Sequence, residues 1–538
     1  MRTGWRAAVG TGVFLFLVIF LSLAGGCGTP DDSSSSADSE ATVDDDHGSP
    51  PGSIQENDDN EADDDSADDD DDAADDDSGD DDVAACGYAP LPTNENGVFV
   101  SADTGNDDNP GTMQAPKKTI AAAIPLAYNA GQSVFVAGGR YEESVLAKVS
   151  VFGGYRAANW TRDIEAVRTI VAPPFQQKFV INNDEKGKTI VLEGMEIHGS
   201  ADTNNQPYNH TATSAAVTVD SEAAVLSCNK LVGGSVVDIG GMAGAISAAV
   251  QVVAAPSLLL VDNLLQGGPA FGIIGAESIG LWIDAPSHQV VAKRNVIRSG
   301  LAVGPVIGGA IIGVSVSSLT SSAKTVLIAN EIRAESPSAG AKVDEAVAVG
   351  SYGLGKLVMI ANSVLMKEAG YDAAIVAYGP IVLLQNTIFS ENEWPARSLW
   401  LADTATLVDN VFVASGDGAS RFIEVNNDAH QLRFFANDFY DDSPGFSFVY
   451  HDTFAITDLA EFNACQWAGC AAAAGNISVD PLLAGANDVH LQTGSPCIDQ
   501  GVDPSSWYDG DAIHFDLDGD PRPQGAGWDI GADEAAAR

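Results

Sequence analysis

Basic residues are scarce in this sequence, and their scarcity excludes one large class of partners. The chain has 26 Lys and Arg against 75 Asp and Glu, which gives a formal net charge of -49. A protein that binds a nucleic acid backbone needs a basic surface that releases counterions from the phosphates. We therefore expect no nucleic acid partner.

Apolar runs long enough to span a bilayer are also missing. The run "VFLFLVIFLSLA" (13–24) follows Arg2 and Arg6 and is shorter than the roughly 20 residues of a transmembrane helix, which is typical of a signal peptide. The "GGCG" that follows resembles the lipobox of bacterial lipoproteins, although Ala24 stands where Leu is commonest. The resemblance implies a signal peptide over 1–26 and membrane attachment through a lipid on Cys27; the alternative is an ordinary signal peptide with a chance cysteine. Gly28 in place of Asp favours the outer membrane.

Lys and Arg are absent from residues 31–82, which contain 25 Asp and Glu. Such a segment buries too little apolar surface to offset its ordering entropy, and its charges repel one another. We therefore predict a disordered acidic tether over 27–85. The remaining chain is acidic as well, with 50 Asp and Glu against 26 Lys and Arg.

An asparagine recurs through the body of the chain at intervals of 24 to 35 residues, the length of one coil of a solenoid. The repeated positions are Asn229, Asn263, Asn295, Asn330, Asn362, Asn386, Asn410 and Asn437. The residues two after and three before each Asn are always apolar, whereas the residue directly after it varies. Because side chains alternate along a strand, this pattern predicts stacked parallel strands with two inward columns and one outward column. We expect the Asn to occupy the bend between two strands in αL geometry, within about nine to eleven coils.

The segment "NGVFVSADTGNDDNPGTMQAPKKTIAAAIPLA" opens the body and carries a family resemblance. Its strand, its Asx-Pro-Gly-Thr turn (109–112) and its Thr119-Ile120 before an alanine-rich stretch resemble the start of the DUF1565 type of right-handed parallel β-helix, a pectate-lyase-like fold. The resemblance implies an all-β, right-handed parallel β-helix. Residues 120–127 predict a short helix that caps the first coil.

The end of the chain, "NISVDPLLAGANDVHLQTGSPCIDQG" and "DLDGDPRPQGAGWDIGADE", resembles the ending of secreted β-helix proteins of the choice-of-anchor Q kind. It departs from them at Asp533, where an aromatic residue is usual. The chain therefore divides into a cap with the first coils (86–160), the main coils (161–460) and a closing segment (461–538).

Five cysteines remain besides Cys27, an odd number for an exported chain. Cys465 and Cys470 are close enough for a small loop disulfide, with Cys497 as competitor for either partner, and the sequence leaves the pairing with Cys86 open. Cys228 precedes Asn229 in a variable column and is expected to be a partly exposed lone thiol.

Catalytic patterns are weak. The pectin-hydrolase motifs Gly-His-Gly and Asn-Thr-Asp are absent, as is the Arg-x-Pro-x-x-Arg of pectate lyases. A polysaccharide lyase needs a carboxylate to hold Ca²⁺ beside a Lys or Arg base. The best candidates for that arrangement are Asp284, Lys293, Arg294 and Arg298.

Two aspartate clusters have the oxygen ligands that Ca²⁺ prefers. Asp516, Asp518 and Asp520 alternate in "FDLDGDPRP", but the terminal Glu of an EF-hand loop is replaced by Trp528, so the alternative is a turn with an Arg522 ion pair. Asp103, Asp107 and Asp108 form a second, weaker cluster.

These features favour an exported, lipid-anchored β-helix that binds glycans or neighbouring envelope material without catalysis. A polysaccharide lyase or glycoside hydrolase acting in the same groove, or a purely structural envelope protein, are the alternatives. The sequence leaves the ligand and the oligomeric state open.

Overall fold

A computed structural model describes residues 86–536, except for 184, 205–210, 239–243, 286–287, 305–306, 336–344, 368–372, 393–395, 417–419, 442–444 and 486. The predicted signal peptide (1–26), Cys27 and the tether (27–85) lie outside the described residues. Within them, no helix is long and apolar enough to cross a bilayer.

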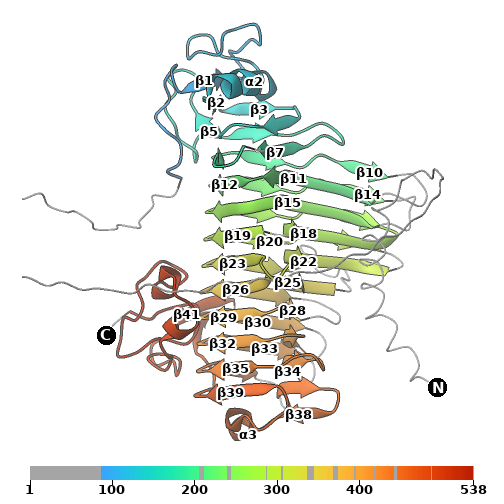
Figure 1. The fold of residues 1–538 in the computed structure, drawn as a ribbon, viewed down its shortest axis with the longest axis vertical. Helices are drawn as coiled ribbons and strands as arrows, with labels where there is room; N and C mark the ends of the chain where they lie inside the picture. The colour runs from blue at the N-terminus through green and yellow to red at the C-terminus, as the bar shows by residue number, and fades with distance from the viewer. Residues whose placement is uncertain are drawn as a thin grey trace, which may run out of the picture. The chain divides into compact units, whose positions relative to one another are not determined.

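The described chain winds into a parallel β-helix with three strand faces, which we name faces 1, 2 and 3 in the order in which each coil visits them. Figure 1 shows the strands stacked from the N-terminal coils downward. Face 1 contains β4 (Val145–Ala147), β7 (Phe179–Asn183), β11 (Ala212–Ser221), the first part of β15 (Ala245–Val261), β18 (Ile274–Asp284), β22 (Ile307–Ser318), β25 (Glu345–Gly353), β28 (Ile375–Ala377), β31 (Arg397–Leu401), β34 (Arg421–Val425), β37 (Ser447–His451) and the antiparallel β38 (Phe454–Ile456).

Face 2 is continuous with face 1, because β15 contributes its first part to face 1 and its second part to face 2. It contains β1 (Gly97–Val100), β2 (Ser133–Ala137), β5 (Val151–Tyr155), β8 (Ile190–Glu193), β12 (Ala223–Ser227), the second part of β15, β19 (His288–Lys293), β23 (Lys324–Ile328), β26 (Lys356–Ile360), β29 (Ile381–Leu384), β32 (Ala405–Val408), β35 (Leu432–Phe435) and β39 (Cys470–Ala474).

Face 3 is a separate sheet of eleven strands. They are β3 (Gly139–Tyr141), β6 (Thr169–Val171), β9 (Glu196–His198), β13 (Lys230–Val232), β16 (Leu264–Gln266), β20 (Val296–Arg298), β24 (Glu331–Ala334), β27 (Ser363–Lys367), β30 (Thr387–Asn392), β33 (Val411–Gly416) and β36 (Asp438–Asp441). A short fourth sheet flanks the middle coils and contains β10 (Asp202–Asn204), β14 (Val236–Asp238), β17 (Ala270–Gly272) and β21 (Ala302–Val303). The all-β parallel β-helix is thus confirmed.

The two apolar columns predicted from the repeat form the centre of the coils. Every member is fully buried, from Leu231 to Phe439 on face 3 and from Leu226 to Phe434 on face 2. Strand register stacks each residue on its equivalent in the next coil, as Ile332 does on Val364. Removing these side chains from water is the main stabilising contribution to the fold.

The repeated asparagines form a continuous buried ladder beside this core. In each step the backbone N–H and the side-chain amide of one Asn both donate to the side-chain oxygen of the next, as from Asn330 to Asn362 at 2.9 and 3.0 Å. The ladder begins at the backbone N–H of Met195, which donates to Asn229, and it ends through Asn476 on Asn463. Each bend thereby satisfies backbone groups that burial would otherwise leave unpaired.

The expectation that each Asn itself takes αL geometry is wrong. The left-handed residue is the one before it, with φ between 49° and 58° from Cys228 to Ala436. The Asn side chain must point inward to reach the ladder, so the sharp turn of the backbone falls on the preceding residue, whose side chain points outward. This explains why the preceding column varies in type.

Both ends of the coil stack are covered. The predicted cap is α2 (Ile120–Ala130), whose N-terminal N–H groups are accepted by Thr119 and by the carboxylate of Glu143. At the other end α3 (Leu459–Ala464) buries Phe462 against the last aromatic residues of the core. These helices cover edges that would otherwise be open to pairing with other chains.

The described residues contain two disulfides, and Cys497 is a buried free thiol. Cys465 and Cys470 are bonded beside α3. Cys86 is bonded to Cys228, 142 residues away, in the bend before β13. The expectation of a lone thiol at Cys228 is therefore wrong, because its αL position turns the side chain outward to where the start of the described chain passes.

After β39 the chain turns back and packs along the outside of faces 2 and 3. This covering segment (residues 476–536) holds the antiparallel β40 (Leu483–Gly485) and β41 (Asp488–Leu491) and 3-10 turns at Pro504–Ser506 and Asp511–His514. In Figure 1 it lies beside the C-terminal coils. Ile513 packs on the outward aliphatic residues of β23, β26, β29 and β32.

Candidate functional site

The outer side of face 1 carries an array of aromatic and charged side chains in its C-terminal coils. We name it the aromatic–arginine surface, and it consists of Tyr352, Tyr378, Arg397, Trp400, Arg421, Glu424 and Tyr450. Strand register places Val376, Trp400, Glu424 and Tyr450 in one column, while Leu399 and Ile423 beside them point into the core.

Three of the rings form a continuous row across successive coils. The Tyr352 and Tyr378 ring centroids are 6.0 Å apart, and those of Tyr378 and Trp400 are 4.6 Å apart. Tyr378 is 37% exposed, and the other two rings are half-buried. Gly350 makes this row possible, because a Cβ there would lie 2.4 Å from the Tyr352 ring. The ring therefore lies over the sheet.

Charged groups border this row on the next two strands. Glu424 accepts from Arg421 at 2.9 Å and lies 3.2 Å from Arg397. The guanidinium of Arg421 also stands 3.5 Å from the centroid of the Tyr450 ring, a cation–π contact. One carboxylate thus serves two guanidinium groups, and both arginine side chains remain 27% exposed. Exposed apolar faces beside fixed donors are a suitable surface for a sugar ring.

A second feature of face 1 is a pair of glutamates in one outward column. Glu277 on β18 pairs with Ala310, which in turn pairs with Glu345 on β25. Two strand spacings place the glutamate backbones about 10 Å apart. Burial, followed by the charge of Glu345, raises the pKa of Glu277 to about 7. Burial also raises the pKa of Glu345. Glu277 and Glu345 stand 14 and 15 residues after Asn263 and Asn330, so their shared column could have been found from the sequence.

The four lyase candidates are not brought together. Asp284 ends β18 on face 1, Lys293 ends β19 on face 2, and Arg298 lies on β20 of face 3. Arg294 occupies the bend between β19 and β20 and donates twice to Asp262, both at 2.8 Å. The predicted base and carboxylate therefore lie on different faces of the coil.

One aspartate of each predicted calcium cluster accepts backbone N–H groups. Both oxygens of Asp516 accept N–H groups, from Asp518 and Asp520 on one side and from Glu534 on the other. The nearby Arg522 is buried and pairs with Glu534 at 3.6 Å. In the other cluster, Asp107 accepts from Lys118 and Thr119 and so fixes the start of α2.

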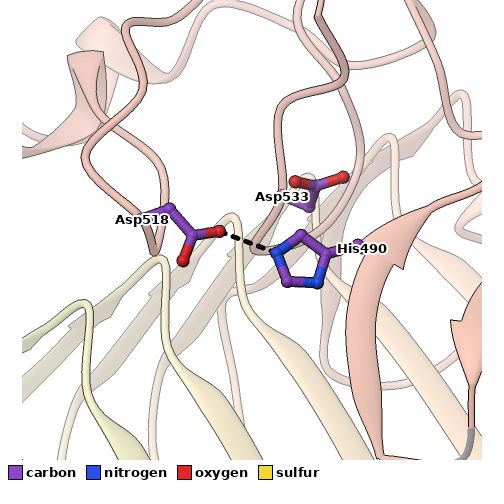
Figure 2. Close-up of side chains that lie close together, drawn as sticks. All are labelled: His490, Asp518 and Asp533. Carbon is purple, nitrogen blue, oxygen red and sulfur yellow. Dashed lines mark hydrogen bonds and ion pairs between the residues drawn. The ribbon is translucent and has the colours of Figure 1, made fainter.

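Among the described residues, one group of three side chains has metal-ligating atoms all within 4.8 Å of one another. It consists of His490, Asp518 and Asp533, shown in Figure 2. The hydrogen bond to Asp488, and then that to Asp518, raise the pKa of His490 to about 9. Sequence spacing pointed to Asp518 alone, although Asp533 was the residue at which the sequence departs from the choice-of-anchor Q ending that it resembles.

The sequence also contains a signal for the row of rings on face 1. Tyr352, Tyr378 and Trp400 stand 10, 8 and 10 residues before Asn362, Asn386 and Asn410. The near-constant offset across three consecutive repeats places the rings side by side.

Comparison with known proteins supports the architecture. The family described as "Protein of unknown function (DUF1565)" matches residues 103–149, which confirms that predicted resemblance over the cap and first coils. A search of curated protein sequences finds no match to the chain.

Solved structures with a similar course of the chain include carbohydrate-active enzymes. The pectate lyase Pel9A is 10% identical, with 82% of this chain and 97% of that chain covered and a TM-score of 0.36. The GH136 lacto-N-biosidase from Eubacterium ramulus, as its selenomethionine derivative, is 13% identical over 66% of this chain and 65% of that one, with a TM-score of 0.30. Likeness at this level carries no argument about activity.

Proposed function

We propose that the protein is an exported, lipid-anchored β-helix that binds an extracellular polysaccharide along the outer side of face 1. The observation that carries this proposal is the row of rings formed by Tyr352, Tyr378 and Trp400 across three coils. Apolar ring faces at coil spacing, beside arginines that donate hydrogen bonds, suit consecutive sugar units of an extended chain.

The charge of the protein favours a neutral polysaccharide. The chain outside residues 31–82 has 50 acidic and 26 basic residues, and like charges repel a polyanionic chain. On the aromatic–arginine surface, Arg397 and Arg421 share Glu424, which leaves a formal charge of only +1 there, against -24 for the whole chain outside residues 31–82. Binding through ring faces and neutral hydrogen bonds depends little on salt.

Affinity electrophoresis through gels that contain neutral or acidic polysaccharides tests the proposal. We expect Trp400→Ala to weaken retardation by a neutral polysaccharide at least tenfold, with a smaller loss for Tyr378→Ala. Phe175→Ala is the matched control, since that ring is 53% exposed and lies outside the surface. Equal retardation of wild type and Trp400→Ala across all the gels contradicts the proposal.

Attachment to the outer membrane is the second part of the proposal, and it depends on Cys27. We expect Cys27→Ala to abolish metabolic labelling with a lipid precursor and to move the protein into the soluble fraction, because the apolar run 13–24 is too short to span a bilayer. Unchanged fractionation counts against the anchor without bearing on glycan binding.

Glycoside hydrolysis is a second candidate function, and the stacked pair Glu277 and Glu345 favours it. Hydrolases that invert configuration place two carboxyl groups about 6.5–9.5 Å apart, one of them protonated near neutral pH. The raised pKa of Glu277 fits the acid, and β25 carries both Glu345 and Tyr352. New reducing ends that appear with wild type and vanish in both Glu277→Gln and Glu345→Gln are the expected result; product formation by these variants excludes this pair.

A further inference from the structure

We propose that His490, Asp518 and Asp533 bind a divalent transition metal such as Zn²⁺, in the covering segment and apart from the glycan surface. One ligand atom from each residue lies within 4.8 Å of the other two. In Figure 2 the carboxylates of Asp518 and Asp533 lie on the same side of the imidazole. The three residues come from β41, the loop after the second 3-10 turn and the final turn of the chain.

The imidazole is held in the orientation that a ligand needs. Nδ1 of His490 is hydrogen-bonded to the carboxylate of Asp488 on the same strand, while Nε2 lies 2.8 Å from Asp518 Oδ2. A carboxylate that accepts the far N–H of a histidine is the usual outer support of a metal-bound imidazole, because it fixes the ring and its tautomer. Asp488 is therefore a positioning residue, and Nε2 is the ligand atom.

Asp533 supplies a fixed oxygen. Its side chain is more than nine-tenths buried, and Oδ2 accepts the backbone N–H of Leu491 at 2.7 Å. One carboxylate oxygen of Asp533 therefore stands within 4.8 Å of a ligand atom of His490 and of a ligand atom of Asp518.

The donor set selects the class of metal. One imidazole nitrogen and two carboxylate oxygens are common ligands of Zn²⁺ and its neighbours, whereas Ca²⁺ prefers six to eight oxygens. Ligands at about 2.0–2.2 Å from a tetrahedral Zn²⁺ stand roughly 3.4 Å apart. Rotation of Asp518, whose side chain is half exposed, brings the three atoms to that separation. A fourth position remains for water or for a ligand from outside.

The metal would join three stretches of the covering segment that are far apart in sequence. The hydrogen bond from Leu491 to Asp533 already brings two of them together. A bound ion would fix the third, the loop that contains Asp518, and so hold the covering segment more tightly on faces 2 and 3. Metal binding and order in residues 488–534 are therefore coupled.

Titration of the full-length chain with Zn²⁺, after removal of metals by chelation, tests this site. We expect a site of one ion per chain above the weak background of the acidic residues, and at least a tenfold loss of its affinity in His490→Ala and in Asp518→Asn. Asp518→Asn keeps the shape of an exposed side chain, so its loss cannot be attributed to misfolding. His430→Ala is the matched control, because His430 is exposed and bonded to the carbonyl of Asp428.

Hydrogen exchange provides a second readout. Zn²⁺ is expected to slow exchange in residues 488–534 of the wild type and of His430→Ala, while Ca²⁺ at the same concentration leaves it unchanged. Equal Zn²⁺ affinity in wild type and His490→Ala, or slowed exchange in both, overturns the proposal.

Discussion

The residue directly after each ladder asparagine faces water in one half of face 3 and is buried in the other half. In the N-terminal coils this column holds Lys230, Leu264, Val296 and Glu331, which are exposed or half-buried. In the C-terminal coils Thr387, Val411 and Asp438 occupy the same repeat position and are fully buried beneath the covering segment. The repeat therefore sets where a side chain points, and a segment from outside the repeat sets what surrounds it.

Replacing the acidic residue of each half by Lys should give the largest difference in folding stability between the two halves. In Asp438→Lys an ammonium group would be buried where Val479 N–H and the Cys497 thiol now donate, at a cost of several kcal/mol. Glu331→Lys breaks exposed ion pairs with Arg298 and Arg333 and should cost about 1 kcal/mol or less. Chemical unfolding measures both, and similar losses would show that the covering segment does not seal the column.

The pH dependence of the covered half should be the next largest effect. Burial raises the pKa of Asp438 to about 6, so its protonated form is favoured in the folded state. Stability from this group is fully present below the ordinary aspartate pKa and is lost as pH rises through about 6, by on the order of 3 kcal/mol. Burial also raises the pKa of Asp409, in the same direction.

We therefore expect residues 476–536 to resist proteolysis better at pH 5 than at pH 7.5. The control is Asp438→Asn, which cannot ionise and should reduce this difference. A covering segment that became more resistant as pH rose would contradict the assignment.

The smallest of the three effects concerns hydroxyl groups. Thr387 accepts the backbone N–H of Ala532 at 3.0 Å, so Thr387→Val leaves that N–H buried without a partner, at a cost of about 1–3 kcal/mol. Ser363→Val changes a half-buried position one coil earlier and should stay within about 0.5 kcal/mol of neutral. Hydrogen exchange at Ala532 distinguishes them, and unchanged protection in Thr387→Val would rule out the bond.

The coil architecture was predictable because its signal repeats. Apolar residues at fixed offsets from eight asparagines indicate the inward columns, and Thr119-Ile120 marks the start of the capping helix. The burial of Thr387, Val411 and Asp438 was not predictable, because they occupy the same repeat position as Glu331. The difference comes from the covering segment, which lies over the C-terminal coils. The Cys86–Cys228 bond was missed for a related reason, because it joins the repeat to a segment that has no repeat.

The candidate sites also differ in whether the repeat predicts them. The ring row of face 1 has a near-constant offset from the ladder and could have been found from the sequence. The group His490, Asp518 and Asp533 could not, because three irregular stretches meet there through turns whose course depends on contacts with the coils. Sequence spacing favoured Asp516 and Asp520 as ligands, whereas the fold uses Asp516 to accept backbone N–H groups.

The disulfide between Cys86 and Cys228 also decides how the molecule carries a mechanical load. A pull on the chain ahead of Cys86 passes through the sulfur atoms into the bend before β13, the fourth strand of face 3. Residues 87–227, which include α2 and the first coils, then lie outside the load path. With the bond reduced, the same pull would reach β1 first and peel the N-terminal coils one after another. If the chain is held from its N-terminal side, this bond places the attachment point in the body of the coil stack.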